Sequence, residues 1–370
     1  MENKTTPIRL LELTFSELVS ELKSRYGKGA YHAAAIFREV YINGNINPGK
    51  APEFINSKAI YHQLHKDLQI NVNTVSAIKK ENGLTKFVTK LKDGLEIESV
   101  IIPMATHYTV CVSSQVGCKM GCKFCETAIL GFFRNLSVEE IIGQVYTAKF
   151  VFGADVRNVV FMGMGEPLDN FDNVVQAIRV MEDQRGLDIP KRYISVSTAG
   201  LVPGIQKLAD LNWPQLNLAV SLNAPNDEIR SKIMPINKIY SMNNLRKMLV
   251  NFPRKKNGAV YIEYVLIKRV NDRREHAMQL ADYLKPLKAK FNLIPYNCRT
   301  DSLFLTPSED DVSRFLNWLV ENEIFVRKRS VKGRNIMAGC GQLGNKHHIS
   351  SHRLLPEHQP ERFNHFDRVI

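Results

Sequence analysis

The chain has 370 residues, 44% of them hydrophobic, and this size and composition suit a globular protein with one large domain and a smaller one. No apolar run reaches the ~18 residues that a membrane span requires, and residues 1–9 lack the apolar core of a secretory signal, so we expect a cytoplasmic protein. The formal net charge of +13 favours polyanionic partners, although many basic proteins never bind nucleic acid.

Residues 1–77 are predicted to form a small helical domain. Hydrophobic residues recur at three- and four-residue steps over 11–25, and similar helical patterning covers 30–41. The polar segment 43–45 and the following Pro48 are expected to end the second helix.

A β-hairpin is predicted next, with strands at 86–91 and 96–102 joined by Asp93-Gly94. Residues 78–104 are therefore expected to link the helical domain to the rest of the chain. Lysines gather here and predict a basic edge, which a solvated sheet face explains equally well. They are Lys79, Lys80, Lys86, Lys90 and Lys92.

From residue 108 onward, strand-like and helical stretches alternate. The helix after the cysteine-rich stretch at 118–125 begins with Ser137-Val138-Glu139-Glu140, a capping-box pattern. This alternation predicts an α/β protein whose parallel sheet forms a partial (β/α)6 barrel over 105–300, with its chemistry at the carboxyl ends of the strands. The six strand-like runs are 108–112, 158–162, 193–197, 216–222, 260–267 and 291–295.

A C-terminal extension follows the barrel. Residues 301–344 are expected to contain a helix at 309–322 and a basic strand at 324–329. The last segment, 345–370, is expected to be a flexible or loosely docked tail. Five of the ten histidines lie in it without a metal-binding spacing: His347, His348, His352, His358 and His365.

The stretch from Cys118 to Cys125 carries three cysteines at C-x3-C-x2-C spacing, with Cys122 between them and Phe124 beside the last. Iron–sulfur clusters are held by thiolates, and three ligands leave one iron of a four-iron cluster open. Structural zinc prefers four ligands and often two C-x2-C pairs, but one such pair occurs here. Three buried structural thiols are the other alternative. Three of the six cysteines lie within eight residues, so we expect the protein to occupy a reducing compartment and not to be built on a disulfide framework.

This octet resembles the radical S-adenosylmethionine (SAM) superfamily, in which SAM chelates the open iron. From about Glu98 to Leu343 the chain is also similar to the RNA adenine methyltransferases that modify 23S rRNA and tRNA at adenine C2, and to their C8-methylating antibiotic-resistance relatives. The resemblance implies a [4Fe-4S] cluster and SAM as cofactors, an N-terminal domain that assists RNA binding, and a flavodoxin or ferredoxin system as the electron donor. A monomer is expected.

The resemblance selects SAM contacts at the ends of the predicted strands. Glycines and an acidic side chain in 162–167 allow close approach of a ligand and binding of an amine, although a tight turn also explains them. Hydroxyls and amides at the next strand ends suit the ribose and carboxylate, and turn capping is the simpler explanation for each. Relatives usually have His where Asn223 stands and a small residue where Glu126 stands. The implied contacts are Gly165, Glu166, Ser197, Ser221, Leu222, Asn223 and Asn297.

Cys111 and Cys340 lie far apart in the sequence and would ordinarily be core residues. The resemblance makes both catalytic, because Cys340 begins a Cys-Gly-Gln-Leu match, with Gly339 in place of the usual Ala. It implies that one SAM methylates Cys340 and that a second yields a 5′-deoxyadenosyl radical, which takes hydrogen from the S-methyl group. The carbon radical then adds to adenine, and Cys111 releases the product through a transient disulfide. Cys298 is expected to be a free buried thiol.

A base must also remove the ring proton, and a carboxylate suits that task. The resemblance assigns it to Glu98, for which pattern alone would favour a surface charge on a strand. Candidate phosphate contacts are the basic groups at 254–256, 268–269, 273–274 and 327–329, which solvated turns and helix ends explain nearly as well.

Together these features predict a radical SAM methyltransferase that acts on adenine C2 in 23S rRNA, with tRNA as a further candidate substrate. C8 methylation of 23S rRNA is the alternative within this class. Outside it, the alternatives are a zinc-stabilised, non-enzymatic RNA-binding protein and an electron-transfer ferredoxin, for which the fourth ligand is missing. The sequence leaves open the ring carbon, the RNA and the reductase.

Overall fold

The structure, a computed structural model, describes residues 6–55, 57–297, 302–329, 333 and 335–344. Six parallel strands lie side by side in chain order and form the predicted partial barrel, with bounds close to those expected from the hydrophobic runs. They are β6 (Tyr108–Cys111), β9 (Val156–Phe161), β10 (Ile194–Thr198), β11 (Asn217–Ser221), β12 (Val260–Leu266) and β13 (Ala289–Pro295).

Further strands extend this sheet at both edges to ten in all. Next to β6 lie antiparallel β5 (Glu96–Pro103), β4 (Leu84–Lys90) and β3 (Thr74–Glu81), and beside β13 lies parallel β14 (Val326–Lys328). The predicted hairpin is confirmed as β4 and β5. Strand β3 was not predicted, and the expected boundary at residue 77 falls inside it.

The basic edge predicted for this hairpin needs one correction. Lys79, Lys80, Lys90 and Lys92 are exposed, but Lys86 is buried. Its side chain points from β4 into the interior, where it pairs with the buried carboxylate of Glu98. Hydrophobic periodicity cannot reveal such a partner.

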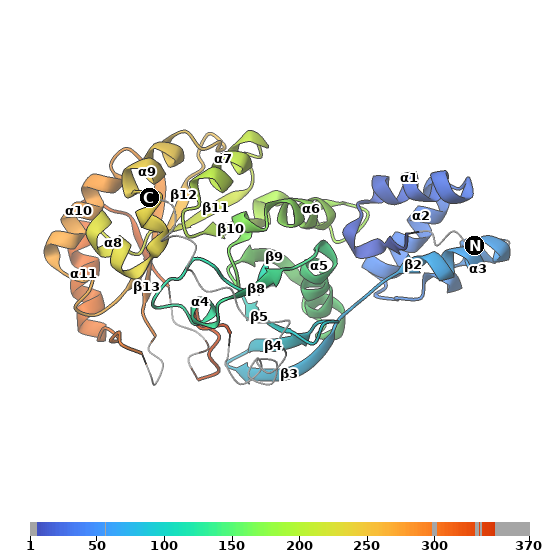
Figure 1. Ribbon diagram of the computed structural model, residues 1–370, viewed down its shortest axis with the longest axis horizontal. Helices are drawn as coiled ribbons and strands as arrows, with labels where there is room; N and C mark the ends of the chain where they lie inside the picture. Colours follow the sequence, from blue (N-terminus) through green and yellow to red (C-terminus); the bar gives the residue numbers. More distant parts are fainter. Residues whose placement is uncertain (1–5, 56, 298–301, 330–332, 334, 345–370) are drawn as a thin grey trace.

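Helices cover the outer face of the barrel (Figure 1). The capping box predicted at Ser137 is present at the start of the first of them, where Ser137 accepts from Glu140 N and the Glu140 carboxylate accepts from Ser137 N. The helices are α5 (Val138–Tyr146), α6 (Phe171–Glu182), α7 (Val202–Asp210), α8 (Asp227–Ile233), α9 (Met242–Val250), α10 (Arg274–Leu284) and α11 (Glu309–Glu321).

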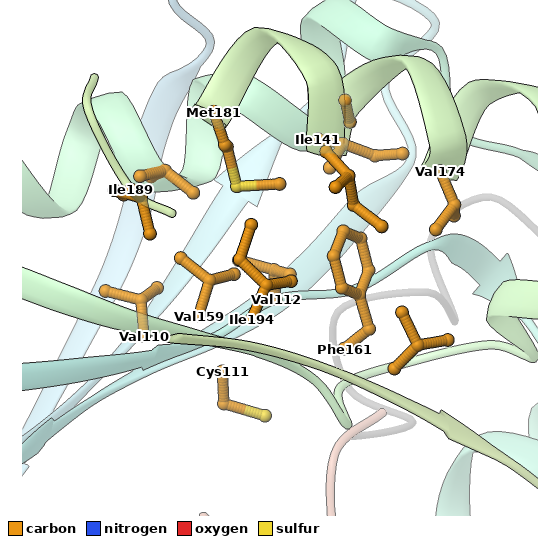
Figure 2. Close-up of a cluster of buried hydrophobic side chains, with 14 of the residues drawn as sticks. Val110, Cys111, Val112, Ile141, Val159, Phe161, Val174, Met181, Ile189 and Ile194 are labelled. Carbon is orange, nitrogen blue, oxygen red and sulfur yellow. The ribbon is translucent and has the colours of Figure 1, made fainter. Parts of the chain in front are cut away.

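The main hydrophobic core lies between the sheet and these helices. Figure 2 shows Val110 and Val112 on one face of the sheet, packed toward Ile141 of α5 and Met181 of α6. Cys111 points to the opposite face, because successive side chains of a strand alternate. The inner face of the barrel therefore receives the thiol of Cys111.

The N-terminal helices form a group at one end of the molecule (Figure 1). The group contacts the barrel helices through Phe15 N, which donates to Asp183 Oδ2 at 2.6 Å, and through Asn71 Nδ2, which donates to Glu139 Oε1 at 2.9 Å. Its elements are β1 (Ile8–Arg9), α1 (Phe15–Tyr26), α2 (Ala30–Phe37), α3 (Lys58–Asp67) and β2 (Leu68–Gln69).

The first predicted helix begins later than its hydrophobic pattern suggested. Leu10–Glu12 form a separate 3-10 turn, and Thr14 caps α1 in a capping box with Glu17. The second predicted helix continues past α2 as a π-helical turn over Arg38–Ile42. None of the described helices is long and apolar enough to cross a membrane.

Candidate active site

A small two-stranded sheet holds the cysteine-rich loop. It consists of β7 (Gln115–Gly117) and β8 (Phe132–Asn135), and Cys118 N donates to Gly131 O at 2.9 Å. Gly117 has φ of +76°, and a Cβ there would lie 1.8 Å from Gly131 O, so the entry into the loop requires glycine. The loop ends where the short helix α4 (Glu126–Leu130) begins.

The thiols of Cys118, Cys122 and Cys125 line one cavity at the carboxyl ends of the barrel strands. Burial raises the pKa of all three, and the charges of neighbouring thiols add to the shift at Cys118 and Cys122. The N–H groups of Thr127 and Ala128, at the start of α4, bond the Cys125 sulfur and oppose it. Three neighbouring thiols with N–H donors aimed at sulfur fit the ligand set of an iron–sulfur cluster.

A single metal ion fits this site less well. Within the part of the chain that the structure describes, no three His, Cys, Asp or Glu side chains converge on the position of one ion. Each iron of a cluster binds its own thiolate, so the sulfurs of a cluster site need not meet at one point.

Gly165 and Glu166 form the turn after β9 and line the same cavity. Gly165 has φ of +101°, and a Cβ there would lie 2.6 Å from the Gln115 side chain, so no larger residue fits. The Glu166 carboxylate accepts from Ala199 N at 2.7 Å and from Leu168 N at 3.2 Å. Burial raises its pKa to about 7 against these bonds. An acidic group at the cavity wall suits the binding of an amine.

The remaining predicted SAM contacts divide into two groups. Ser197, Ser221 and Asn223 line the cavity, whereas Leu222 and Asn297 are not among its lining residues. Asn223 has φ of +55°, which Asn tolerates better than most residues, and its Oδ1 accepts from Val265 N at 2.8 Å. Its side chain therefore fixes the end of β12 relative to β11 as well as facing the cavity.

Arg230 of α8 supports these strand ends and was missed in the sequence. It is 0% exposed, and its guanidinium donates to Ala199 O at 2.6 Å, Leu222 O at 3.1 Å and Ser221 O at 3.2 Å. A fourth bond reaches Asn237 Oδ1 at 3.0 Å. An arginine on a short surface helix ordinarily predicts a solvated side chain, so no local signal marked it.

Cys340 is exposed and lines the same cavity from a segment near the end of the described chain. Two backbone contacts seat this segment on α4. Gly341 O accepts from Glu126 N at 2.8 Å, and Leu343 O accepts from the Thr127 hydroxyl at 2.7 Å. The unusual Glu126 thus contacts the Cys340 segment through its backbone.

A polar cluster lies beside Cys340. Glu263 is 5% exposed, its Oε1 accepts from Asn292 Nδ2 at 2.8 Å, and its Oε2 has no hydrogen-bond partner among the described residues. Arg329 lies 3.7 Å from Glu263 and contacts the Cys340 thiol. Arg329 was predicted as a phosphate contact, but it lines the cavity. Glu263 was missed because it stands alone within an apolar strand.

Cys111 lies close to Cys340, although it is not among the lining residues. Burial raises the pKa of the Cys111 thiol to about 12, the charge of Cys340 adds to this shift, and Arg329 opposes it. Cys111 and Cys340 are therefore neighbours in space, although they lie far apart in the sequence. Cys298, predicted to be a buried thiol, lies outside the described residues.

Glu98, the carboxylate predicted to act as the base, is held by two polar contacts. It is buried on β5 and is not among the cavity lining. One carboxylate oxygen lies 2.8 Å from Lys86 Nζ, and the other accepts from Gly344 N at 2.7 Å.

Comparison with known proteins identifies the family. Residues 112–281 match the Radical SAM superfamily. A probable dual-specificity RNA methyltransferase RlmN 1 from Protochlamydia amoebophila is 42% identical over 342 residues, which are 92% of this chain and 95% of that protein. The chain belongs to the RlmN family of radical SAM RNA methyltransferases. The RlmN of Syntrophotalea carbinolica is 39% identical over 350 residues, or 94% of this chain and 92% of its own length.

A solved structure agrees with this assignment. A radical SAM methyltransferase from Sphaerobacter thermophilus has a TM-score of 0.84 and 35% identity, over 91% of this chain and 99% of its own. As an RlmN-family enzyme, the chain uses a [4Fe-4S] cluster and SAM to methylate RNA. The predicted family and fold are confirmed, and the non-enzymatic zinc protein and the ferredoxin are set aside.

Proposed function

We propose that this RlmN-family enzyme methylates adenine C2 in 23S rRNA and also in tRNA. The names of its relatives, which describe dual-specificity RNA methyltransferases, support two kinds of RNA substrate. The observation that carries the chemistry is the proximity of two thiols, Cys111 and Cys340, beside a cavity lined by three more.

Cys118, Cys122 and Cys125 would hold the cluster. SAM would lie against Gly165, Glu166, Ser197, Ser221 and Asn223, with Leu222 and Asn297 supporting the site from the same strand ends. When bound, the two cofactors supply a methyl group and the one-electron chemistry that an electron-poor aromatic carbon requires. Glu166 would bind the amine of SAM through a lone pair that its bonds from Leu168 N, Ala199 N and the Thr198 hydroxyl leave free.

Cys340 would accept the methyl group on sulfur and carry its carbon to the adenine ring, which leaves the RNA bonded to the protein. Cys111 as a thiolate would then attack the Cys340 sulfur. The new S–S bond replaces the S–C bond, and the electron pair stays on carbon, which takes a proton and becomes the methyl group of the product. A dithiol reductant must afterwards return two electrons to the disulfide.

Two carboxylates compete for the role of proton acceptor. Family resemblance assigns it to Glu98, which must first release Gly344 and turn toward the cavity. Glu263 already lines the cavity with an oxygen that has no hydrogen-bond partner among the described residues, and burial raises its pKa, which makes the carboxylate a stronger base. Glu98 remains the first proposal and Glu263 the second.

The exposed lysines of the hairpin would contact RNA phosphates together with the exposed basic residues Lys255, Lys256, Arg273, Arg274 and Arg327. The N-terminal helical domain would add to this surface. We further propose a monomeric, cytoplasmic enzyme reduced by a flavodoxin or ferredoxin system.

Nucleoside mass spectrometry tests the proposal directly. The enzyme, with its cluster reconstituted anaerobically, is incubated with SAM, a reductant and either a 23S rRNA fragment or tRNA. We expect 2-methyladenosine from both RNAs. If 8-methyladenosine were the product instead, the enzyme would belong to the C8-methylating branch. If only one of the two RNAs were methylated, the proposed dual specificity would be wrong.

A further inference from the structure

A buried ion pair joins the hairpin to the segment that carries Cys340. Lys86 on β4 and Glu98 on β5 lie diagonally across the two strands, with Nζ and Oε1 2.8 Å apart. The side chains are 3% and 5% exposed. Removing two charges from water is expensive, so a buried pair is weak evidence of a purely stabilising role.

Each member of the pair also binds the Cys340 segment. Lys86 Nζ donates to Met337 O at 3.0 Å, and Glu98 Oε2 accepts from Gly344 N at 2.7 Å. Cys340 lies between these two attachment points. The ion pair therefore holds a short loop on both sides of the reactive thiol.

The hairpin itself has little need of this pair. β4 and β5 are already joined by a regular antiparallel register from Thr85 opposite Ile101 to Lys90 opposite Glu96. The Cys340 segment, in contrast, has no partner strand among the described residues, and its other polar contacts include α4, Arg329 and the exposed Glu81–Asn335 bond. Loss of the ion pair should therefore displace the Cys340 segment more than it disturbs the hairpin.

We propose that Lys86 and Glu98 form a clamp that positions Cys340 at the cavity for its own methylation. Both are positioning residues, since neither lines the cavity in the described conformation. This inference rests on the proposed function of Cys340. It also separates two roles of Glu98 in time, because a clamp acts before RNA binds and a base acts only after the RNA is attached.

The test measures methylation of Cys340 in the reconstituted holoenzyme, incubated with SAM in the absence of RNA and followed by mass spectrometry. Lys86→Met and Glu98→Gln should each slow it by about tenfold or more, since a misplacement of ~1 Å at a reacting group has effects of that size. Lys86→Arg, which keeps the charge and a donor, should recover most of the rate. Lys247→Met, at an exposed position on α9 and outside the cavity and the proposed RNA-binding surface, is the control and should behave like the wild type.

Hydrogen exchange gives a readout that needs no turnover. Amides of residues 338–344 should exchange faster in Lys86→Met and Glu98→Gln than in the wild type, and Lys86→Arg should remain protected. Iron content should not change in any of these variants.

The double variant Lys86→Met/Glu98→Gln covers the case in which one unpaired buried charge prevents folding. It removes both charges, so it should fold and bind iron while methylating Cys340 slowly. A normal methylation rate in this variant would show that the pair only stabilises the fold, and would overturn the clamp.

The remaining outcomes are distinct. If the wild type never methylates Cys340, the proposed function fails, whatever the variants do. If the wild type does so and Glu98→Gln matches it in both methylation and exchange, but stalls after RNA attachment, Glu98 is a base and the clamp is wrong.

Discussion

The two cysteine-bearing segments of the site are built in opposite ways. The cluster loop is fixed mainly by near neighbours in the sequence, through β7, β8 and the first turn of α4, and Lys123 N adds one bond to the more distant Ile233 O at 2.9 Å. The Cys340 segment is fixed by residues more than 200 positions away, namely Lys86, Glu98 and Thr127. A ligand loop can therefore be recognised from its own residues, whereas the position of Cys340 depends on distant partners.

The largest effect expected is on the locally built segment. Cys118→Ala removes one of the three proposed cluster ligands and should reduce SAM cleavage to background, with iron falling well below the roughly four atoms per chain of an intact cluster. Iron analysis and chromatography of the cleaved nucleoside measure both. Cys111→Ala, which removes a thiol outside the loop, is the control and should bind the normal amount of iron. SAM cleavage at the normal rate in Cys118→Ala would contradict cluster binding by this loop.

The distant segment is tested by removing its partner thiol. Cys111→Ala should stop release of the product and accumulate RNA bonded to the protein, because it removes the thiolate proposed to attack the Cys340 sulfur. A shifted band on a denaturing gel detects the adduct. Cys340→Ala should give no such band, and free methylated RNA at the normal rate from Cys111→Ala would disprove the role.

The pH dependence of adduct release tests the role of Cys111 at the distantly built segment. The pKa of the Cys111 thiol is raised to about 12, so its thiolate is scarce at neutral pH and becomes more abundant as pH rises. Release of the adduct in a single turnover should accelerate by about tenfold per pH unit between about pH 7 and 9. SAM cleavage without RNA serves as the control for general pH effects. A flat profile would show that another group deprotonates Cys111.

A smaller effect is expected at the strand ends behind the cluster loop. Arg230→Met leaves several buried carbonyls without their donor and should lower the free energy of unfolding by about 3–5 kcal/mol. SAM affinity should fall by roughly tenfold as Ser221 shifts. Denaturant unfolding and SAM binding measure these changes, with Lys232→Met as the exposed control on the same helix. An unchanged midpoint would contradict the supporting role of Arg230.

The sequence predicted those features whose causes are local. The six barrel strands appear as apolar runs, and the cap at Ser137 follows from residues three positions apart. The cluster cysteines lie together because their spacing alone brings them onto one loop. Hydrophobic periodicity and short motifs reflect interactions between residues that are close in sequence, so they predict such features well.

Charged residues with distant partners were predicted poorly. Lys86 was expected on a solvated edge, Arg329 among phosphate contacts, and Glu263 and Arg230 were not singled out. Each is buried or turned inward because a polar group from another segment of the chain lies beside it in space, as Met337 O, Ala199 O and the Arg329–Glu263 pair show. Propensity and pattern describe one segment at a time, so they cannot report such pairings.

One contact between the segments has a spectroscopic consequence. Glu126 N, the amide next to the proposed ligand Cys125, donates to the carbonyl of Gly341, the residue after Cys340. We expect this hydrogen bond to transmit a change at the Cys340 thiol to the cluster. We expect the electron paramagnetic resonance signal of the reduced centre to differ before and after Cys340 is alkylated, so that the metal reports on the chemical state of a cysteine that it does not bind.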